Sequence, residues 1–383
     1  MRRVYLDHAA TTPLDPTVAE VYTRHATGVF GNASSLHQWG AAAHNALEEA
    51  REQVAALIGA HAREIIFTSG GTESDNLAIR GTAYQWRNRG RHIITSAIEH
   101  HAVLHTCQDL EQEGFEVTYL PVDREGFVDP EDVRKAIRPD TILITIMMAN
   151  NEIGTIEPVA EIAALARAAG ITFHTDAVQA VGKIPVDVEE LGIDLLSMSA
   201  HKLYGPKGVG ALYIRQGMRI APILFGGAHE RGLRPGTQNV PGAAAFAAAA
   251  AIAAGRLVDD ARTQAALRDR LLDGIVSTIP DTELTGRRYD RLPNHASVLI
   301  EGVDGSALLA GLDMAGIAAS AGSACTAGAV EPSHVLAAMG LVREGDFAAL
   351  RLTLGRSTTM EDIDYVLDVL PGLVERLRRH TRS

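Results

Sequence analysis

Short apolar runs alternate with helix-like stretches through the middle of the chain. The runs are rich in β-branched residues and have the length of buried strands; they lie at 64–68, 92–95, 115–120, 141–147, 171–175 and 195–199. Helical periodicity separates most of them, at 72–89, 101–113, 130–137 and 159–169. Strand, helix and strand in this order predict an α/β fold with a mostly parallel sheet that helices cover on both faces.

The pattern changes after an alanine-rich stretch at 243–254, where Pro241 is expected to begin a helix. A further helix is expected at 261–279, a strand at 297–300, a helix near Ala307, and a last strand and helix over 350–379. We therefore expect a large domain at 13–255 and a smaller α/β domain made of 1–12 and 256–383. The alanine-rich stretch is shorter than the roughly 20 apolar residues that cross a bilayer, so no membrane span is expected.

The composition narrows the classes of partner and the cellular compartment. The net charge of −12 argues against a broad surface for nucleic acid or anionic membrane, because such surfaces need clustered cations. Asp7 and His8 interrupt the place where a secretory signal needs apolar residues, so no signal peptide is predicted. The two cysteines, Cys107 and Cys325, have no metal-ligand spacing. They favour a cytoplasmic protein with free thiols.

Lys202 is the first candidate for chemistry. It ends the segment Ser199-Ala200-His201-Lys202 after a predicted strand, and it is one of four lysines among 35 cationic side chains. A lysine amine can lose its proton and form a Schiff base with a carbonyl, whereas a guanidinium cannot. Lys207 is the competing candidate, while Lys135 and Lys183 are expected to be solvated charges. From this motif alone, a surface lysine near a turn is an equally good interpretation.

Two further segments follow predicted strands, where ligands bind in parallel sheets. The turn from Thr68 to Thr72 leads into a helix, and its amides and hydroxyls suit a phosphate; a plain capped helix start is the alternative. Asp176 ends another strand, three residues before Gln179. It either caps the next helix or, if an amine-reactive heterocycle binds, keeps the ring nitrogen of that heterocycle protonated.

Glu99-His100-His101 follows the strand that ends at Thr95. A histidine here can stack on a flat ring and move protons near neutral pH. A satisfied surface histidine is the alternative, and we favour it for His101. The triplet also offers metal ligands, but adjacent residues on a helix do not face one direction, so no intrinsic metal site is expected.

Taken in order, these segments resemble the class V aminotransferase-like enzymes that use pyridoxal phosphate. Two more segments, Tyr5 to Thr12 and Ser320 to Gly328, narrow the resemblance to the cysteine desulfurases of the iron–sulfur-cluster and nitrogenase type. The resemblance covers essentially the whole chain. It implies the type I fold of pyridoxal phosphate-dependent transferases, with a cysteine loop at about 320–336 in the small domain.

The resemblance also implies a role for each site residue. Lys202 is expected to bind the cofactor covalently, Cys325 to carry a persulfide, and His100 to stack on the cofactor as acid and base. The other cofactor-binding positions are Gly71, Thr72, Asn151, Asp176, Gln179, Ser199, His201 and Thr237. Asn151 and Arg351 are expected to bind the substrate, Arg351 through its carboxylate. Thr237 matches a position that reaches the phosphate of the neighbouring subunit, which implies a homodimer.

The implied function is a cysteine desulfurase, a sulfurtransferase that converts L-cysteine to L-alanine and leaves a persulfide on Cys325. The sulfur is expected to pass to an acceptor such as an iron–sulfur scaffold protein, and whether Cys325 ligates a cluster shared with that scaffold is left open. Two alternatives also stay open. One is another enzyme of the same cofactor class, such as a selenocysteine lyase or an aminotransferase, and the other is a non-catalytic sulfur-relay subunit. Cys107 is expected to be a buried structural residue.

Overall fold

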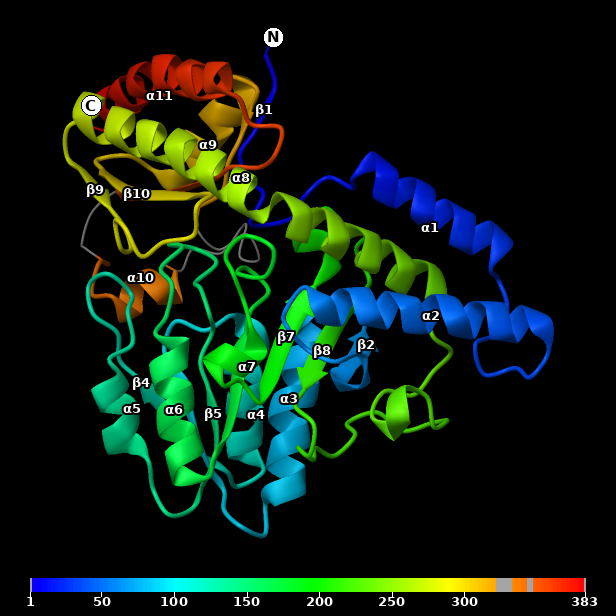
Figure 1. Ribbon diagram of the computed structural model, residues 1–383. Coiled ribbons are helices and arrows are strands. Elements are labelled where there is room, and N and C mark those ends of the chain that lie inside the picture. The colour runs from blue at the N-terminus through cyan, green and yellow to red at the C-terminus, as the bar shows by residue number, and fades with distance from the viewer. Residues whose placement is uncertain (1, 322–332, 343–346, 382–383) are drawn as a thin grey trace.

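The computed structural model describes residues 2–321, 333–342 and 347–381. Its centre is a seven-stranded sheet in the order β2-β8-β7-β6-β5-β3-β4 (Figure 1). The strands are β2 (Ile65–Thr68), β3 (His92–Ser96), β4 (Glu116–Leu120), β5 (Thr141–Thr145), β6 (Thr172–Asp176), β7 (Leu195–Ser199) and β8 (Gly210–Ile214). β8 runs antiparallel to β2 and β7, and the remaining neighbours are parallel. The expected mostly parallel α/β sheet is confirmed.

Helices cover both faces of this sheet because alternate side chains of each strand point to opposite faces. Ile144 of β5 packs into the hydrophobic cluster of one face, and Leu143 packs into the cluster of the other face. The first face carries α1 (Pro16–Gly28), α2 (Gln38–Ala56), α5 (Pro130–Ala136), α6 (Val159–Ala169) and α7 (Val188–Leu191). The second carries α3 (Gly71–Trp86) and α4 (His101–Gln112).

A second hydrophobic core lies around a three-stranded antiparallel sheet of order β12-β10-β9. Its strands are β9 (Thr282–Leu284), β10 (His295–Glu301) and β12 (Phe347–Thr353), and its helices are α9 (Gly305–Met314) and α11 (Met360–Thr381). The short α10 (His334–Ala338) follows in another cluster, which it shares with β10. Near the amino terminus, β1 (Val4–Tyr5) pairs with β11 (Ile317–Ala318). The N-terminal segment therefore lies against this second core.

The helix α8 (Val240–Thr278) joins the two cores and is continuous where two separate helices were expected. It packs against α1 and α2 at one end and against α11 at the other (Figure 1). Gly255 lies within it on the exposed surface, where a glycine costs a helix only about 1 kcal/mol relative to alanine and does not end it. By length and composition α8 could cross a membrane, but 56% of its apolar window is buried within the chain, as in a core helix. The predicted domain boundary at residue 255 falls inside α8 and stays a prediction.

Candidate active site

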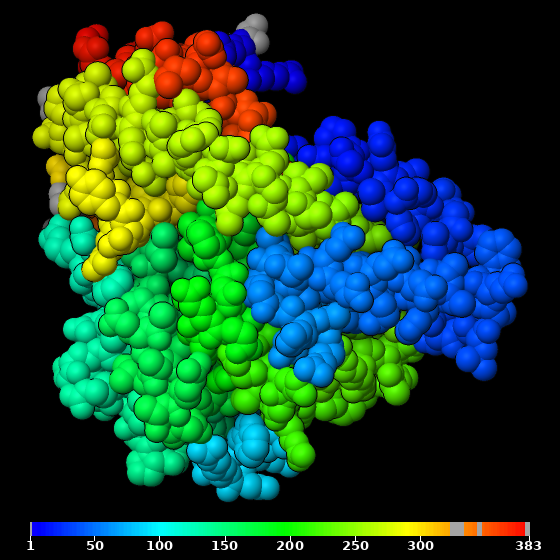
Figure 2. Space-filling model, viewed as in Figure 1, coloured from blue at the N-terminus to red at the C-terminus, as the bar shows by residue number. Residues whose placement is uncertain are grey.

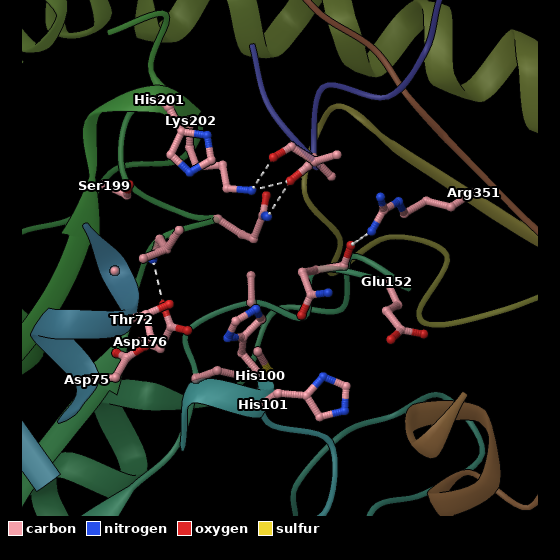
Figure 3. A pocket seen from close by; sticks show the side chains of 18 of the residues that line it. Thr72, Asp75, His100, His101, Glu152, Asp176, Ser199, His201, Lys202 and Arg351 are labelled. Atoms are coloured by element: carbon pink, nitrogen blue, oxygen red, sulfur yellow. Dashed lines mark hydrogen bonds between the residues drawn. The ribbon is translucent and has the colours of Figure 1, made fainter. Parts of the chain in front are cut away.

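Five strands of the large sheet bring polar side chains to one cavity of about 310 Å³ at their carboxyl ends (Figure 3). This is the place where parallel sheets bind ligands. Ten of the predicted site residues line it: Gly71, Thr72, His100, Asn151, Asp176, Gln179, Ser199, His201, Lys202 and Arg351. Thr237 is exposed and is not part of this lining. Cys325 lies outside the residues that the structure describes.

Lys202 ends the short helix η2 (Ala200–Lys202), which follows β7 directly. Its Nζ donates hydrogen bonds to the carbonyl oxygens of Ala9 at 2.5 Å and Ala10 at 2.8 Å. The competing candidate, Lys207, is exposed and does not line the cavity. The structure therefore places the amine of Lys202, and not that of Lys207, where a carbonyl compound can reach it.

The amino terminus of α3 forms the phosphate-sized end of the cavity. The helix begins at Gly71, and the amides of a first helical turn have no partner within the helix. A Cβ atom at Gly71 would lie 2.7 Å from Cγ2 of Val178, so only glycine allows this approach. Thr72 and Ser199 add hydroxyl groups to the same lining. Unsatisfied amides and hydroxyls together suit an anion.

Two buried carboxylates and one imidazole also line the cavity. Ligand atoms of Asp75, His100 and Asp176 lie within 4.8 Å of one another. Burial raises the pKa of both aspartates, and the charge of Asp176 raises the pKa of Asp75 further. Because two carboxylates this close cannot both ionise readily, we assign the retained proton to Asp75. An oxygen of Asp176 also accepts from the amide of Val178 at 2.9 Å.

His100 caps the amino terminus of α4, where its Nδ1 accepts from the amide of Ala102 at 3.1 Å. This hydrogen bond fixes the ring and leaves Nε2 as the other polar atom. Burial lowers the pKa of His100, and the positive charge of Lys202 lowers it too, although Asp176 acts in the opposite direction. The ring is therefore held neutral, with its proton on Nε2, where it is available for donation.

Arg351 approaches the cavity from the second core, on β12. Its guanidinium donates to the carbonyl oxygen of Asn151 at 2.9 Å and to a carboxylate oxygen of Asp7 at 2.9 Å. The side chain is almost completely buried. A fixed and buried guanidinium at a cavity wall is a suitable partner for a carboxylate.

Two acids of the site escaped the sequence analysis. Asp75 lies on the buried face of α3, and Glu152 is buried beside the cavity, where it accepts from Oγ of Ser333 at 2.5 Å. The signal for Asp75 was present, since an acid interrupts the apolar face of the periodic stretch 72–89. Glu152 lies in a turn, where periodicity carries no signal.

The expectation that Lys183 is a solvated charge is wrong. Its Nζ donates to the carbonyl oxygen of Gln179 at 2.8 Å, and the side chain faces a small cavity of about 20 Å³ that Lys202 and His8 also line. Burial lowers the pKa of Lys183 to about 7, and the nearby charge of Lys202 contributes. A second amine therefore lies directly behind the one in the site.

Comparison with known proteins places this geometry in a family. Residues 4–366 match the family Aminotransferase class-V. The chain is 52% identical over 377 residues to the cysteine desulfurase IscS of Dictyoglomus turgidum, covering 98% of this chain and 96% of that protein. A solved NifS-like protein superposes with a TM-score of 0.92 at 40% identity, covering 98% of this chain and all of the other. SspA in complex with cysteine superposes with a TM-score of 0.80 at 37% identity, covering 92% and 98%.

The chain therefore belongs to the class V aminotransferase family and, within it, to the pyridoxal phosphate-dependent cysteine desulfurases. The expected family, fold type and cofactor are confirmed. The roles of individual site residues stay predictions.

Proposed function

We propose that this protein takes sulfur from L-cysteine, releases L-alanine and holds the sulfur as a persulfide on Cys325. One observation supports this most: a single cavity holds an amine (Lys202), a buried acid (Asp176), a neutral imidazole (His100) and a buried guanidinium (Arg351). Each of these groups has a use in removing the α proton from an amino acid. The names of the relatives supply the substrate class, since they are cysteine desulfurases.

The residues that line the cavity suit each functional group of pyridoxal phosphate. The first turn of α3 with Thr72, Ser199 and His201 suits the phosphate, and the amine of Lys202 suits the aldehyde. Asp176 is a buried acid that suits a pyridinium nitrogen, and Gln179 lines the same cavity. When bound, the cofactor supplies a protonated ring that takes up the electron pair left by the departing α proton.

The chain's own residues carry out the remaining steps. Arg351 binds the substrate carboxylate with Asn151 beside it, Lys202 takes the α proton, and neutral His100 moves protons for the thiols. The thiolate of Cys325 then attacks the sulfur atom of the substrate. A sulfur–sulfur bond forms while the Cβ–S bond breaks, and its electron pair stays with the three-carbon product, which becomes alanine on protonation.

The rival functions differ from this proposal in their products. An aminotransferase makes a keto acid and no alanine from cysteine, and a selenocysteine lyase needs the selenium substrate. A non-catalytic relay subunit would be purified without the absorbance of the cofactor. Quantifying alanine and sulfide from L-cysteine, with selenocysteine as the second substrate, separates all three.

Persulfide mapping tests the proposal directly. After brief exposure of the holoenzyme to L-cysteine without reductant, mass spectrometry is expected to place added sulfur on the peptide that contains Cys325. Cys325→Ser should form no persulfide, because a hydroxyl near neutral pH provides almost no anion. Cys107→Ser is the control: Cys107 is buried as expected, and burial raises the pKa of its thiol. Sulfur on Cys107, or undiminished sulfide release by Cys325→Ser, would contradict the proposal.

The proposal includes a homodimer that completes the cavity through Thr237. Thr237 is exposed in one chain, as a residue reaching into a neighbour must be. The preceding segment carries the exposed side chains Leu224 and Phe225. Its Glu230 carboxylate accepts two hydrogen bonds from the guanidinium of Arg51, which holds the segment against α2. Figure 2 shows α2 lying beside this region. A sulfur-acceptor protein, such as an iron–sulfur scaffold, and a cytoplasmic location complete the proposal.

A further inference from the structure

Three histidine rings lie together at the edge of the cavity, outside the residues with proposed roles. His101 and His105 lie on α4, four residues apart, and their ring centroids are 4.9 Å apart. His334 comes from α10, and its ring centroid lies 4.7 Å from that of His101. Figure 3 shows the ring of His101 turned away from His100, on the side where Glu152 lies.

The expectation of no intrinsic metal site considered only Glu99, His100 and His101. It overlooked His105, which lies one helical turn after His101 and therefore shares its face of α4. Two histidines at this spacing are a recurring pair of metal ligands. The structure adds the third, His334, from a segment more than 200 residues away in the sequence.

The hydrogen bonds of the three rings leave nitrogen atoms for a ligand. Nε2 of His334 lies 2.9 Å from the carbonyl oxygen of Glu99, so it donates there and leaves Nδ1 as an acceptor. Metal-binding histidines are commonly oriented by such a bond to a carbonyl oxygen. The ring nitrogens of His101 and His105 make no hydrogen bond to another described residue.

The surroundings leave room for an ion. A hollow of about 360 Å³ lies over His101 and His105. Arg80 also lines it, but its guanidinium forms ion pairs with Asp109 and Glu113. The cation that borders the hollow is therefore already neutralised.

We propose that His101, His105 and His334 bind one divalent transition-metal ion of the class that prefers imidazole ligands, such as Zn²⁺ or Ni²⁺. Three protein ligands leave coordination positions open, as in catalytic zinc sites. Among the described residues, one group of three has its ligand atoms within 4.8 Å of one another, and that group is Asp75, His100 and Asp176. That group lies inside the cofactor cavity and retains a proton. The nitrogen atoms of the three histidines are farther apart than this, so the exposed ring of His105 must turn to complete the site.

The position of the ion has a consequence for the enzyme, which rests on the proposed function. His101 and His334 line the cavity that the substrate enters. An ion with an open position there binds thiolates readily, so it holds the thiol of the substrate cysteine away from the reaction. We expect Zn²⁺ to inhibit turnover reversibly and a chelator to restore it.

Calorimetric titration of the holoenzyme with Zn²⁺ and Ni²⁺ tests the site without reference to activity. The parent protein should bind one ion per chain. His105→Ala and His334→Ala should each weaken binding by more than the roughly 10–100-fold that loss of an outer-shell partner causes. His44→Ala, which removes an exposed histidine from α2, is the matched control and should bind like the parent.

Cys325→Ser separates this site from a thiolate site. The variant should still bind the ion, and Co²⁺ in the parent should give visible bands without a thiolate charge-transfer band. No binding by the parent, unchanged binding by both histidine variants, or loss of binding in Cys325→Ser alone would overturn the proposal. Circular dichroism checks that each variant is folded. If the site binds but Zn²⁺ leaves persulfide formation unchanged, only the inhibitory consequence fails.

Discussion

Burial changes the charge state of single side chains around the site, and Glu99 shows this most simply. The residue is fully buried after β3, and one of its oxygens accepts from Oγ of Ser96 at 2.7 Å and from the amide of Met147 at 2.9 Å. Burial raises its pKa from 4.5 to about 8. Glu99 is therefore protonated at neutral pH in the folded protein and ionised in the unfolded one.

Glu99→Gln is expected to remove a pH dependence of stability. Between pH 4.5 and about 8 the folded state holds a proton that the unfolded state releases, so this group's contribution to stability is present below pH 4.5 and is lost as pH rises to 8. The unfolding free energy of Glu99→Gln minus that of the parent should rise over this range. Chemical denaturation of the cofactor-free proteins measures it, with exposed Glu20→Gln as control. A pH-independent difference would show that Glu99 ionises normally.

Lys183→Met should change the pH dependence of the unfolding free energy in the opposite direction, and at higher pH. The folded pKa of Lys183 is about 7 against an ordinary 10.5, so between these values the unfolded state binds more protons and the parent gains stability as pH rises. Relative to Lys183→Met, the parent should therefore become more stable between pH 7 and 10.5. Lys207→Met, which removes an exposed amine, should show no such trend. Denaturation curves of the cofactor-free proteins at several pH values distinguish the two variants.

The sequence could predict residues whose position follows from the order of strands, and it failed for residues that depend on packing. Asp176 ends one strand of a parallel sheet and Lys202 closely follows the end of a neighbouring strand, so their meeting at one edge was predictable. Lys183 lies in a turn, and only the folded chain shows that it lines a small cavity together with Lys202. Thr237 and Cys325 could be assigned only by resemblance.

At the scale of elements, the cavity depends on how closely α3 approaches the turn after β6. A Cβ atom at Gly71 would lie 2.7 Å from Cγ2 of Val178, a short side chain that cannot move far. The alternation of runs predicted both elements, but their close approach was not visible in it. The antiparallel β8 (Gly210–Ile214) was missed as well, since no strand was predicted between the runs at 195–199 and 297–300.

Gly71→Ala should therefore weaken binding of pyridoxal phosphate to the cofactor-free protein. Overpacking of this kind costs about 1–3 kcal/mol, and here it displaces the amides of the first turn of α3 from the phosphate. Val178→Ala removes the contacting methyl groups, so the double variant Gly71→Ala with Val178→Ala should recover most of the affinity. Fluorescence titration gives the dissociation constants. Equal weakening in the single and double variants would rule out this contact as the cause.

At the scale of the whole molecule, the site joins parts of the chain that are far apart in sequence. Arg351 of the second core binds Asp7, and Lys202 binds Ala9 and Ala10, so the N-terminal segment lies between the two cores. α8 connects the cores as one helix of 39 residues. The composition change near residue 255 predicted a boundary, but composition does not show whether a helix continues through such a point.

The proposed dimer depends on the exposed surface of the segment that leads to Thr237. Phe225 is 89% exposed in the segment that leads to Thr237, and an aromatic side chain this exposed near an apolar neighbour such as Leu224 marks an interface. Phe225→Glu should therefore shift the protein from two chains to one in sedimentation velocity. It should also weaken cofactor binding, because Thr237 would no longer reach the phosphate of the neighbouring chain. Tyr289→Glu replaces an aromatic of equal exposure, 88%, in the connection between β9 and β10 and should leave both properties unchanged. A parent protein that sediments as one chain with full cofactor affinity, or a monomeric Phe225→Glu that binds the cofactor as the parent does, would show that each chain completes its own site.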